Sequence, residues 1–168
     1  ARCEGGRIKA SANYLNSRLA GLEAKRQGAG GAILLNEDGT VSEGPGGCLF
    51  VMRDGVFITP DVTSGILESV TRRTMLEMAG SIGVETVERR LGRTELYLAE
   101  EAFYCGTGQE IMPITGLDGR PVGDFCQSSD RSFVHDKLPN LLRVWVNLYP
   151  GFEMDKSACR HSLRAFRY

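Results

Sequence analysis

The chain has 168 residues, 42% of them hydrophobic, which fits one folded domain or one domain with a short appendage. Twenty basic and 21 acidic side chains give a formal net charge of −1, which excludes a broad basic surface and argues against nucleic acid as a partner. No apolar run approaches the roughly 20 residues that cross a bilayer, so we expect neither a membrane span nor a secretory signal.

The first predicted element is an amphipathic helix from Asn13 to about Gln27, with Ser11 or Asn13 as its cap and Gly28 as its end. Its apolar residues recur at nearly helical spacing; they are Tyr14, Leu15, Leu19, Leu22 and Ala24. A short buried strand is predicted over residues 32–36, followed by a turn at 37–39.

A hairpin is predicted next, with strands at 48–52 and 56–59 around a turn at 53–55. Pro60 ends the second strand. A second helix is predicted from Val70 through Met78, with Leu76 and Ala79 on its buried side.

The rest of the first two thirds alternates short elements. They are a half-exposed strand at 84–90, a short helix at 93–100, strands at 102–105 and 111–114, and a turn at 117–119. Residues 125–168 differ in character, with helical periodicity only around 138–148. Mostly antiparallel hairpin strands with two or three packed helices indicate an α+β fold.

Five cysteines lie along the chain without CxxC spacing. Their odd number and the chain length argue against a disulfide framework, so we expect reduced thiols and a cytoplasmic protein. His135 and His161 form no ligand set of standard zinc spacing with Cys126 or Cys159, so we expect no metal site.

Lys9 is the first candidate for chemistry. A lysine that condenses with an aldehyde must be partly deprotonated, and a cationic neighbour such as Arg7 favours this by lowering the lysine pKa. A single lysine near a terminus is more often a solvated surface residue, so Lys9 needs support from other motifs.

Three later motifs give that support. Glu43 lies in a Gly-rich turn before a strand, where a carboxylate suits a protonated ring nitrogen, although an exposed turn glutamate has the same pattern. Residues 65–73 run from a loop into a helix start, which is a natural phosphate site. There, Arg72 and Arg73 oppose the helix dipole, and a bound phosphate would relieve this. Residues 106–110 form a tight turn whose hydroxyl and amides suit a phosphate or carboxylate.

The order and spacing of these motifs resemble the larger domain of the branched-chain amino acid aminotransferase family, in class IV of the aminotransferases that use pyridoxal 5′-phosphate (PLP). The resemblance extends over residues 9–122. It is carried by Lys-Ala-Ser-Ala-Asn-Tyr-Leu-Asn-Ser (9–17), Val-Ser-Glu-Gly (41–44), Asp-Gly-Val-Phe-Ile-Thr-Pro (54–60), Val-Thr-Arg (70–72), Leu-Ala-Glu-Glu-Ala-Phe (98–103) and Gly-Thr-Gly-Gln-Glu-Ile-Met-Pro-Ile (106–114).

The resemblance implies roles around the PLP ring. Lys9 would bind the cofactor covalently and then carry the proton between the substrate α-carbon and the cofactor. Tyr14 would hydrogen-bond the phenolic oxygen, Glu43 would hold the pyridinium, and Leu67 would pack against the ring.

It also implies roles for backbone groups. The amides of Val70 and Thr71, with the hydroxyl of Thr107, would bind the phosphate, and the amides of Thr107 and Gly108 would receive the substrate carboxylate. The implied reaction is transamination of branched-chain L-amino acids with 2-oxoglutarate in a homodimer. Alternatives are an aminodeoxychorismate lyase, a D-amino acid aminotransferase, or a non-catalytic fragment that acts only in folding or dimerisation.

The chain also departs from the family pattern. A smaller N-terminal domain is expected before the lysine, but eight residues precede Lys9, so we expect a fragment that lacks this domain. The family often has Glu-Asn where this chain has Gly47-Cys48, and Gly where it has Ser69. We therefore expect a PLP-binding region over residues 1–124 and an atypical segment over 125–168.

Overall fold

A computed structural model describes residues 9–122 and the backbone of residues 162–167. The helices are α1 (Tyr14–Arg26) and α2 (Val70–Ser81), with 3-10 helices η2 (Ser11–Asn13), η3 (Val62–Ser64) and η4 (Arg93–Leu98). The strands are β1 (Gly31–Leu35), β2 (Cys48–Arg53), β3 (Val56–Thr59), β4 (Thr86–Glu88), β5 (Glu101–Gly106), β6 (Glu110–Pro113), β7 (Gly116–Leu117), β8 (Arg120–Pro121) and β9 (Ser162–Arg167).

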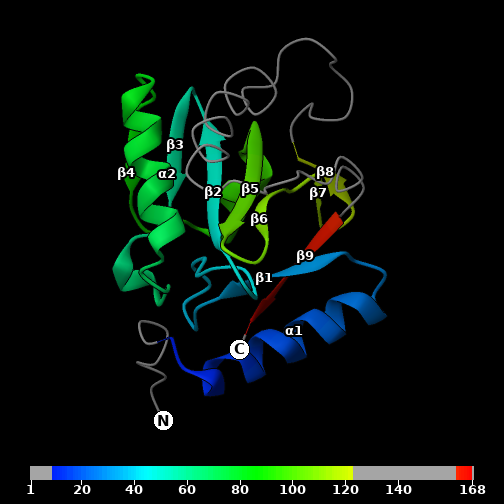
Figure 1. Ribbon diagram of the computed structural model, residues 1–168. Coiled ribbons are helices and arrows are strands. Elements are labelled where there is room, and N and C mark those ends of the chain that lie inside the picture. The colour runs from blue at the N-terminus through cyan, green and yellow to red at the C-terminus, as the bar shows by residue number, and fades with distance from the viewer. Residues whose placement is uncertain (1–8, 123–161, 168) are drawn as a thin grey trace.

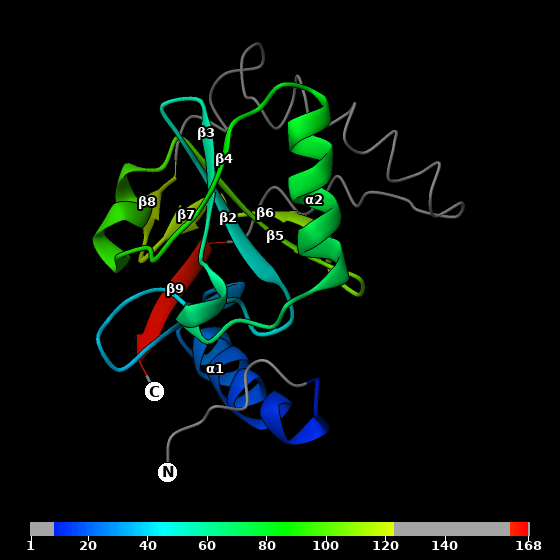
Figure 2. The same ribbon diagram turned by 90° about the vertical axis from the view of Figure 1, so that its left-hand side faces the viewer.

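These strands form two sheets. One has the order β4-β3-β2-β5-β6 and the other the order β1-β9-β7-β8. Helix α2 packs on the five-stranded sheet through β4 and β5, and α1 packs on β1 and β9 of the smaller sheet, away from α2 (Figures 1 and 2). The predicted α+β class is confirmed.

Most predicted elements occur close to their predicted bounds. The β2–β3 hairpin turns at Asp54 and Gly55, which both have positive φ as a tight two-residue hairpin requires. The predicted strand at 84–90 is shorter, since β4 spans Thr86–Glu88, and the short helix after it is a 3-10 helix. No helix in the described ranges is long and apolar enough to cross a membrane. The helix considered around 138–148 lies outside the described residues.

The central strands β2 and β5 are buried on both faces. Towards α2, Phe50 stacks on its cross-strand neighbour Phe103 with ring centroids 5.3 Å apart, and Phe57 meets both rings edge-on. On the opposite face, Leu49 and Val51 belong to a second apolar cluster that includes Ile33 of β1. Residues that alternate along one strand thus serve two separate cores.

Helix α1 forms where predicted, but its buried face is not the one marked by its leucines. Ala20 and Ala24 are fully buried against the smaller sheet, whereas Leu15, Leu19 and Leu22 are 61%, 52% and 50% exposed. Small alanines let the helix axis approach the sheet closely. The leucines, at i, i+4 and i+7, therefore form an apolar stripe that points away from the domain.

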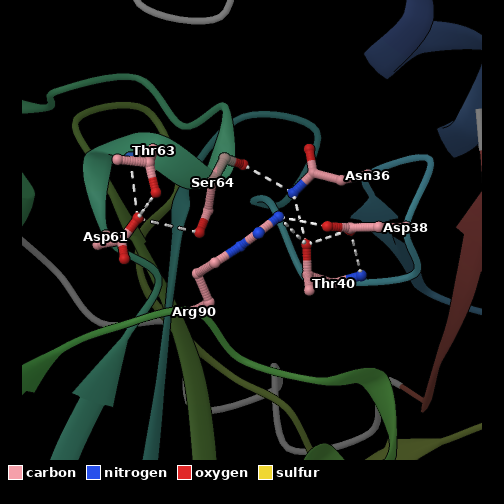
Figure 3. Close-up of polar contacts among 7 residues, drawn as sticks. All are labelled: Asn36, Asp38, Thr40, Asp61, Thr63, Ser64 and Arg90. Carbon is pink, nitrogen blue, oxygen red and sulfur yellow. Dashed lines mark hydrogen bonds and ion pairs between the residues drawn. The ribbon is translucent and has the colours of Figure 1, made fainter.

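A polar network joins the turn after β1 to the loop that leads towards α2 (Figure 3). Asn36 donates to the Ser64 carbonyl at 3.0 Å, and Asp38 accepts from Thr40 and from Arg90. Asp61 caps η3 by accepting from the Thr63 N–H at 2.8 Å. This network holds residues 61–65 in place, just before Leu67, which is one of the predicted cofactor-binding residues.

Candidate functional site

A cavity of about 340 Å³ lies where four chain segments meet. They are the start of α1, the loop before β2, the residues before α2, and the turn between β5 and β6. Six of the eight predicted site residues line this cavity: Lys9, Tyr14, Glu43, Leu67, Thr107 and Gly108. The structure therefore brings together residues that are up to 99 positions apart in the chain.

Glu43 lies in the cavity wall with one carboxylate oxygen held in place. The Leu67 N–H donates to Glu43 Oε2 at 3.0 Å, and the Leu34 N–H donates to the Glu43 carbonyl at 2.8 Å. Burial raises the pKa of the Glu43 carboxyl, while the hydrogen bond from Leu67 opposes this rise. A partly desolvated carboxylate of this kind is best stabilised by a cationic ligand group.

The start of α2 approaches the cavity from another side. Ser69 lines the cavity and caps the helix, accepting from the Arg72 N–H at 3.4 Å. The Thr71 and Thr107 hydroxyl oxygens lie 3.3 Å apart, so two hydroxyls from different elements meet here. Val70 and Thr71 do not line the cavity, and the side chain of Val70 is 74% exposed, so the role implied for Val70 depends on its backbone amide alone. First-turn amides and paired hydroxyls suit an anion.

The two arginines of this turn have partners of their own. Arg72 is buried and donates to the Pro60 carbonyl at 2.9 Å and to Glu88 at 2.7 Å. Arg73 is exposed and pairs with Glu77 at 3.0 Å. These pairs account for both guanidinium groups. That a bound phosphate also offsets their charge at the helix start stays a prediction.

Glycines let the loop before β2 lie flat against β5. A Cβ at Gly47 would lie 2.8 Å from the Cys105 carbonyl oxygen, and one at Gly44 would lie 2.5 Å from the Tyr104 ring. The Tyr104 hydroxyl donates to the Ala32 carbonyl at 2.8 Å, which fixes that ring. Gly47, where the family pattern often has glutamate, is thus required here by close packing of backbone on backbone.

Ten of the residues that line the cavity were not predicted as site residues, and five of them carry a polar or thiol side chain: Asn13, Ser17, Cys48, Ser69 and Gln109. Asn13 and Ser17 lie one helical turn apart beside Tyr14, a spacing that was readable in the sequence. Gln109 is next to the Thr107-Gly108 pair, and its Oε1 is buried without a hydrogen-bond partner among the described residues. Nothing in the sequence indicates that Gln109 Oε1 would be buried without such a partner.

Comparison with known proteins is consistent with this geometry. The chain matches the family model described as amino-transferase class IV over residues 3–117. The branched-chain-amino-acid aminotransferase of Pseudomonas aeruginosa is 44% identical over 117 residues, which are 70% of this chain and 38% of that protein.

Two solved structures are also similar. The branched-chain amino acid aminotransferase from Escherichia coli has a TM-score of 0.76 and 38% identity, covering 90% of this chain and 49% of that one. The enzyme from Thermobaculum terrenum in its PLP-form has a TM-score of 0.75 and 44% identity, covering 84% and 45%. The chain thus spans less than half the length of each of these relatives. Over the part they share, the chain belongs to the class IV aminotransferase family.

Proposed function

We propose that this chain is the cofactor-binding part of a PLP-dependent aminotransferase that acts on branched-chain L-amino acids and 2-oxo acids, with 2-oxoglutarate as amino acceptor. The observation that carries the proposal is the placement of Glu43, a half-buried carboxyl of raised pKa, in the same cavity as Lys9. The Thermobaculum terrenum relative is described in its PLP-form, which supports the choice of cofactor.

The cavity fits the parts of PLP. Glu43 matches a protonated ring nitrogen, Tyr14 offers a phenol to the ring oxygen, and Leu67 offers an apolar surface. The hydroxyls of Thr71 and Thr107 and the α2 amides offer donors to a phosphate.

PLP, when bound, supplies an electron sink that stabilises negative charge at the substrate α-carbon. The side chains of this chain set up that chemistry. Lys9 Nζ would take the α-proton and return it on the cofactor side, and the Glu43 carboxylate would keep the ring nitrogen charged. The Thr107 and Gly108 amides would hold the substrate carboxylate and so fix which bond at the α-carbon faces Lys9.

The first test is covalent capture. The chain mixed with PLP is expected to show a visible absorption band, and borohydride reduction should leave the cofactor mass on the peptide that contains Lys9. Lys9→Ala should give neither, and Lys25→Ala, an exposed lysine of α1, should give both. A band that survives Lys9→Ala would contradict the assignment.

Substrates are tested in the complete protein. Leucine with 2-oxoglutarate is expected to turn over, whereas D-alanine and aminodeoxychorismate are the diagnostic substrates of the alternative enzymes. If the complete protein binds PLP but converts none of these three substrates, the alternative of a non-catalytic protein is favoured.

We also propose a cytoplasmic homodimer, with the leucine stripe of α1 as its contact. Antiparallel packing of two α1 helices about a two-fold axis between Leu19 and Leu22 brings Leu19 against Leu22 of the partner subunit. Glu23, beside this stripe, accepts from Gln27 and pairs with Arg26 within the same helix, so the support for this contact is the exposed apolar stripe itself. The division into residues 1–124 and 125–168 stays a prediction.

Leu19→Glu is the test of that contact. It is expected to convert the dimer to monomers in sedimentation velocity, because it buries a charge in the contact, while the circular dichroism spectrum stays unchanged. Leu98→Glu, at a 60% exposed leucine outside α1, is the matched control and should leave the dimer intact. A Leu19→Glu dimer of unchanged affinity would exclude this surface.

A further inference from the structure

Cys48 and Cys105 are directly opposite each other on the antiparallel strands β2 and β5. Both belong to the apolar cluster under α2, together with the next cross-strand pair on that face, Phe50 and Phe103. Opposite residues in an antiparallel pair have Cα atoms about 4.5 to 5.5 Å apart, inside the range of about 4.4 to 6.8 Å seen for disulfides. Both thiols are free.

One thiol of this pair faces the cofactor cavity. Cys48 lines the cavity, and Cys105 lies behind it, fully buried. Burial raises the pKa of the Cys48 thiol to about 11, and the charge of Glu43 acts in the same direction while that of Arg72 opposes it. Burial also raises the pKa of Cys105, and the Cys48 charge adds to this rise, as expected for adjacent sulfurs. Both thiols therefore stay protonated at neutral pH and react slowly with oxidants. A small molecule can still reach the Cys48 sulfur through the cavity.

We propose that Cys48 and Cys105 form a paired-thiol modification site, which a small two-electron oxidant such as hydrogen peroxide closes to a cross-strand disulfide. The Cys48 thiol releases its proton, its thiolate attacks one peroxide oxygen, and the O–O bond breaks. The products are a Cys48 sulfenic acid and a hydroxide, which takes up the released proton and leaves as water. The Cys105 sulfur then attacks the sulfenic sulfur, the S–O bond breaks, and a second water leaves. Two thiols lose two electrons and two protons, and one peroxide becomes two waters.

Closure of the disulfide changes the cavity wall. The Cys48 S–H donates to the Leu67 carbonyl with an Sγ-to-oxygen distance of 3.6 Å, and the Leu67 N–H in turn holds Glu43. A disulfide sulfur has no proton to donate, so the Leu67 carbonyl loses this partner. Resting here on the proposed function, we expect the disulfide form to bind PLP several-fold more weakly, and bound PLP to slow the oxidation by covering Cys48.

The experiment uses the full chain with Cys3→Ser, Cys126→Ser and Cys159→Ser, which leaves only the pair. After peroxide treatment of the folded protein, intact mass should fall by two hydrogen atoms. No thiol should remain on titration in denaturant, and digestion should yield one peptide pair joined through Cys48 and Cys105. Dithiothreitol should reverse each change. Two remaining thiols, or a mass gain of oxygen alone, would overturn the proposal.

Two further measurements separate the parts of the proposal. Below the pKa of Cys48 the rate should rise about tenfold per pH unit with the thiolate fraction, and a rate that is flat between pH 7 and 9 would exclude the thiolate route. Adding Cys105→Ser to the background should give oxygen addition at Cys48 and no link; Cys105→Val serves if that variant fails to fold. A disulfide that forms without any effect on PLP binding would confirm the modification site and refute its coupling to the cofactor.

Discussion

Glu43→Gln is expected to lower kcat of the complete enzyme by about a hundredfold or more, the range typical of a lost acid–base partner. Glutamine keeps an oxygen that can accept from the Leu67 N–H, so the loop geometry is retained. It carries no charge, however, and cannot hold the cofactor ring nitrogen in its protonated form. PLP should still attach to Lys9, which distinguishes a loss of chemistry from a loss of binding.

The same change is expected to stabilise the cofactor-free chain at neutral pH. Because burial raises the folded-state pKa of Glu43, the native state binds this proton more tightly than the unfolded state. Stability from this group is therefore fully present below the ordinary carboxyl pKa, and it falls as pH rises through the folded pKa. Glutamine does not ionise and avoids that loss.

The measurement is chemical denaturation of the wild type and Glu43→Gln, both without PLP, at acidic and neutral pH. The variant should be more stable at neutral pH, and the difference should shrink in acid. Glu37→Gln, in an exposed turn, is the control and should change neither kcat nor the pH dependence. If the wild type and Glu43→Gln have equal denaturation midpoints at neutral pH, the Glu43 carboxylate is solvated in the cofactor-free state.

Arg72→Ala should lower the free energy of unfolding by about 3 kcal/mol, because it leaves buried polar partners unpaired. Arg72 is 5% exposed, and its guanidinium donates to the Pro60 carbonyl and to Thr59 Oγ1, which sits in a fully buried residue. Glu88 is half exposed and can be solvated by water, so most of the cost comes from the other two partners.

Arg73→Ala is the matched control, one residue further along the same helix. Its side chain is 83% exposed and its pair with Glu77 is solvated, so the change should stay within about 0.5 kcal/mol. Urea denaturation of both variants gives the comparison. Equal losses of unfolding free energy in the two variants would mean that the Arg72 contacts do not stabilise the packing of α2 on β3 and β4.

Local patterns in the sequence predicted most elements, because turns, caps and alternation depend on neighbouring residues. The six cavity-lining residues were predicted as a set only through the resemblance to the aminotransferase family. Three features depended on distant parts of the chain. The parallel pairing of β1 with β9 joins Gly31 to Leu163, and periodicity does not encode a strand's partner. The inward face of α1 was set by how closely Ala20 and Ala24 approach the sheet. Likewise, the partner of Arg72 lies 16 residues away on an edge strand.

Because four distant segments form the cavity, it is completed late in the synthesis of the chain. Lys9 and Gln109 line the same cavity but are 100 residues apart, so the ribosome needs on the order of ten seconds after making Lys9 to supply the last wall. During that interval Lys9 is already part of the chain, while Thr107 and Gly108 are not. A ligand held by all four segments, as we propose for PLP, can therefore bind only after the chain has folded, and its binding stabilises that folded state.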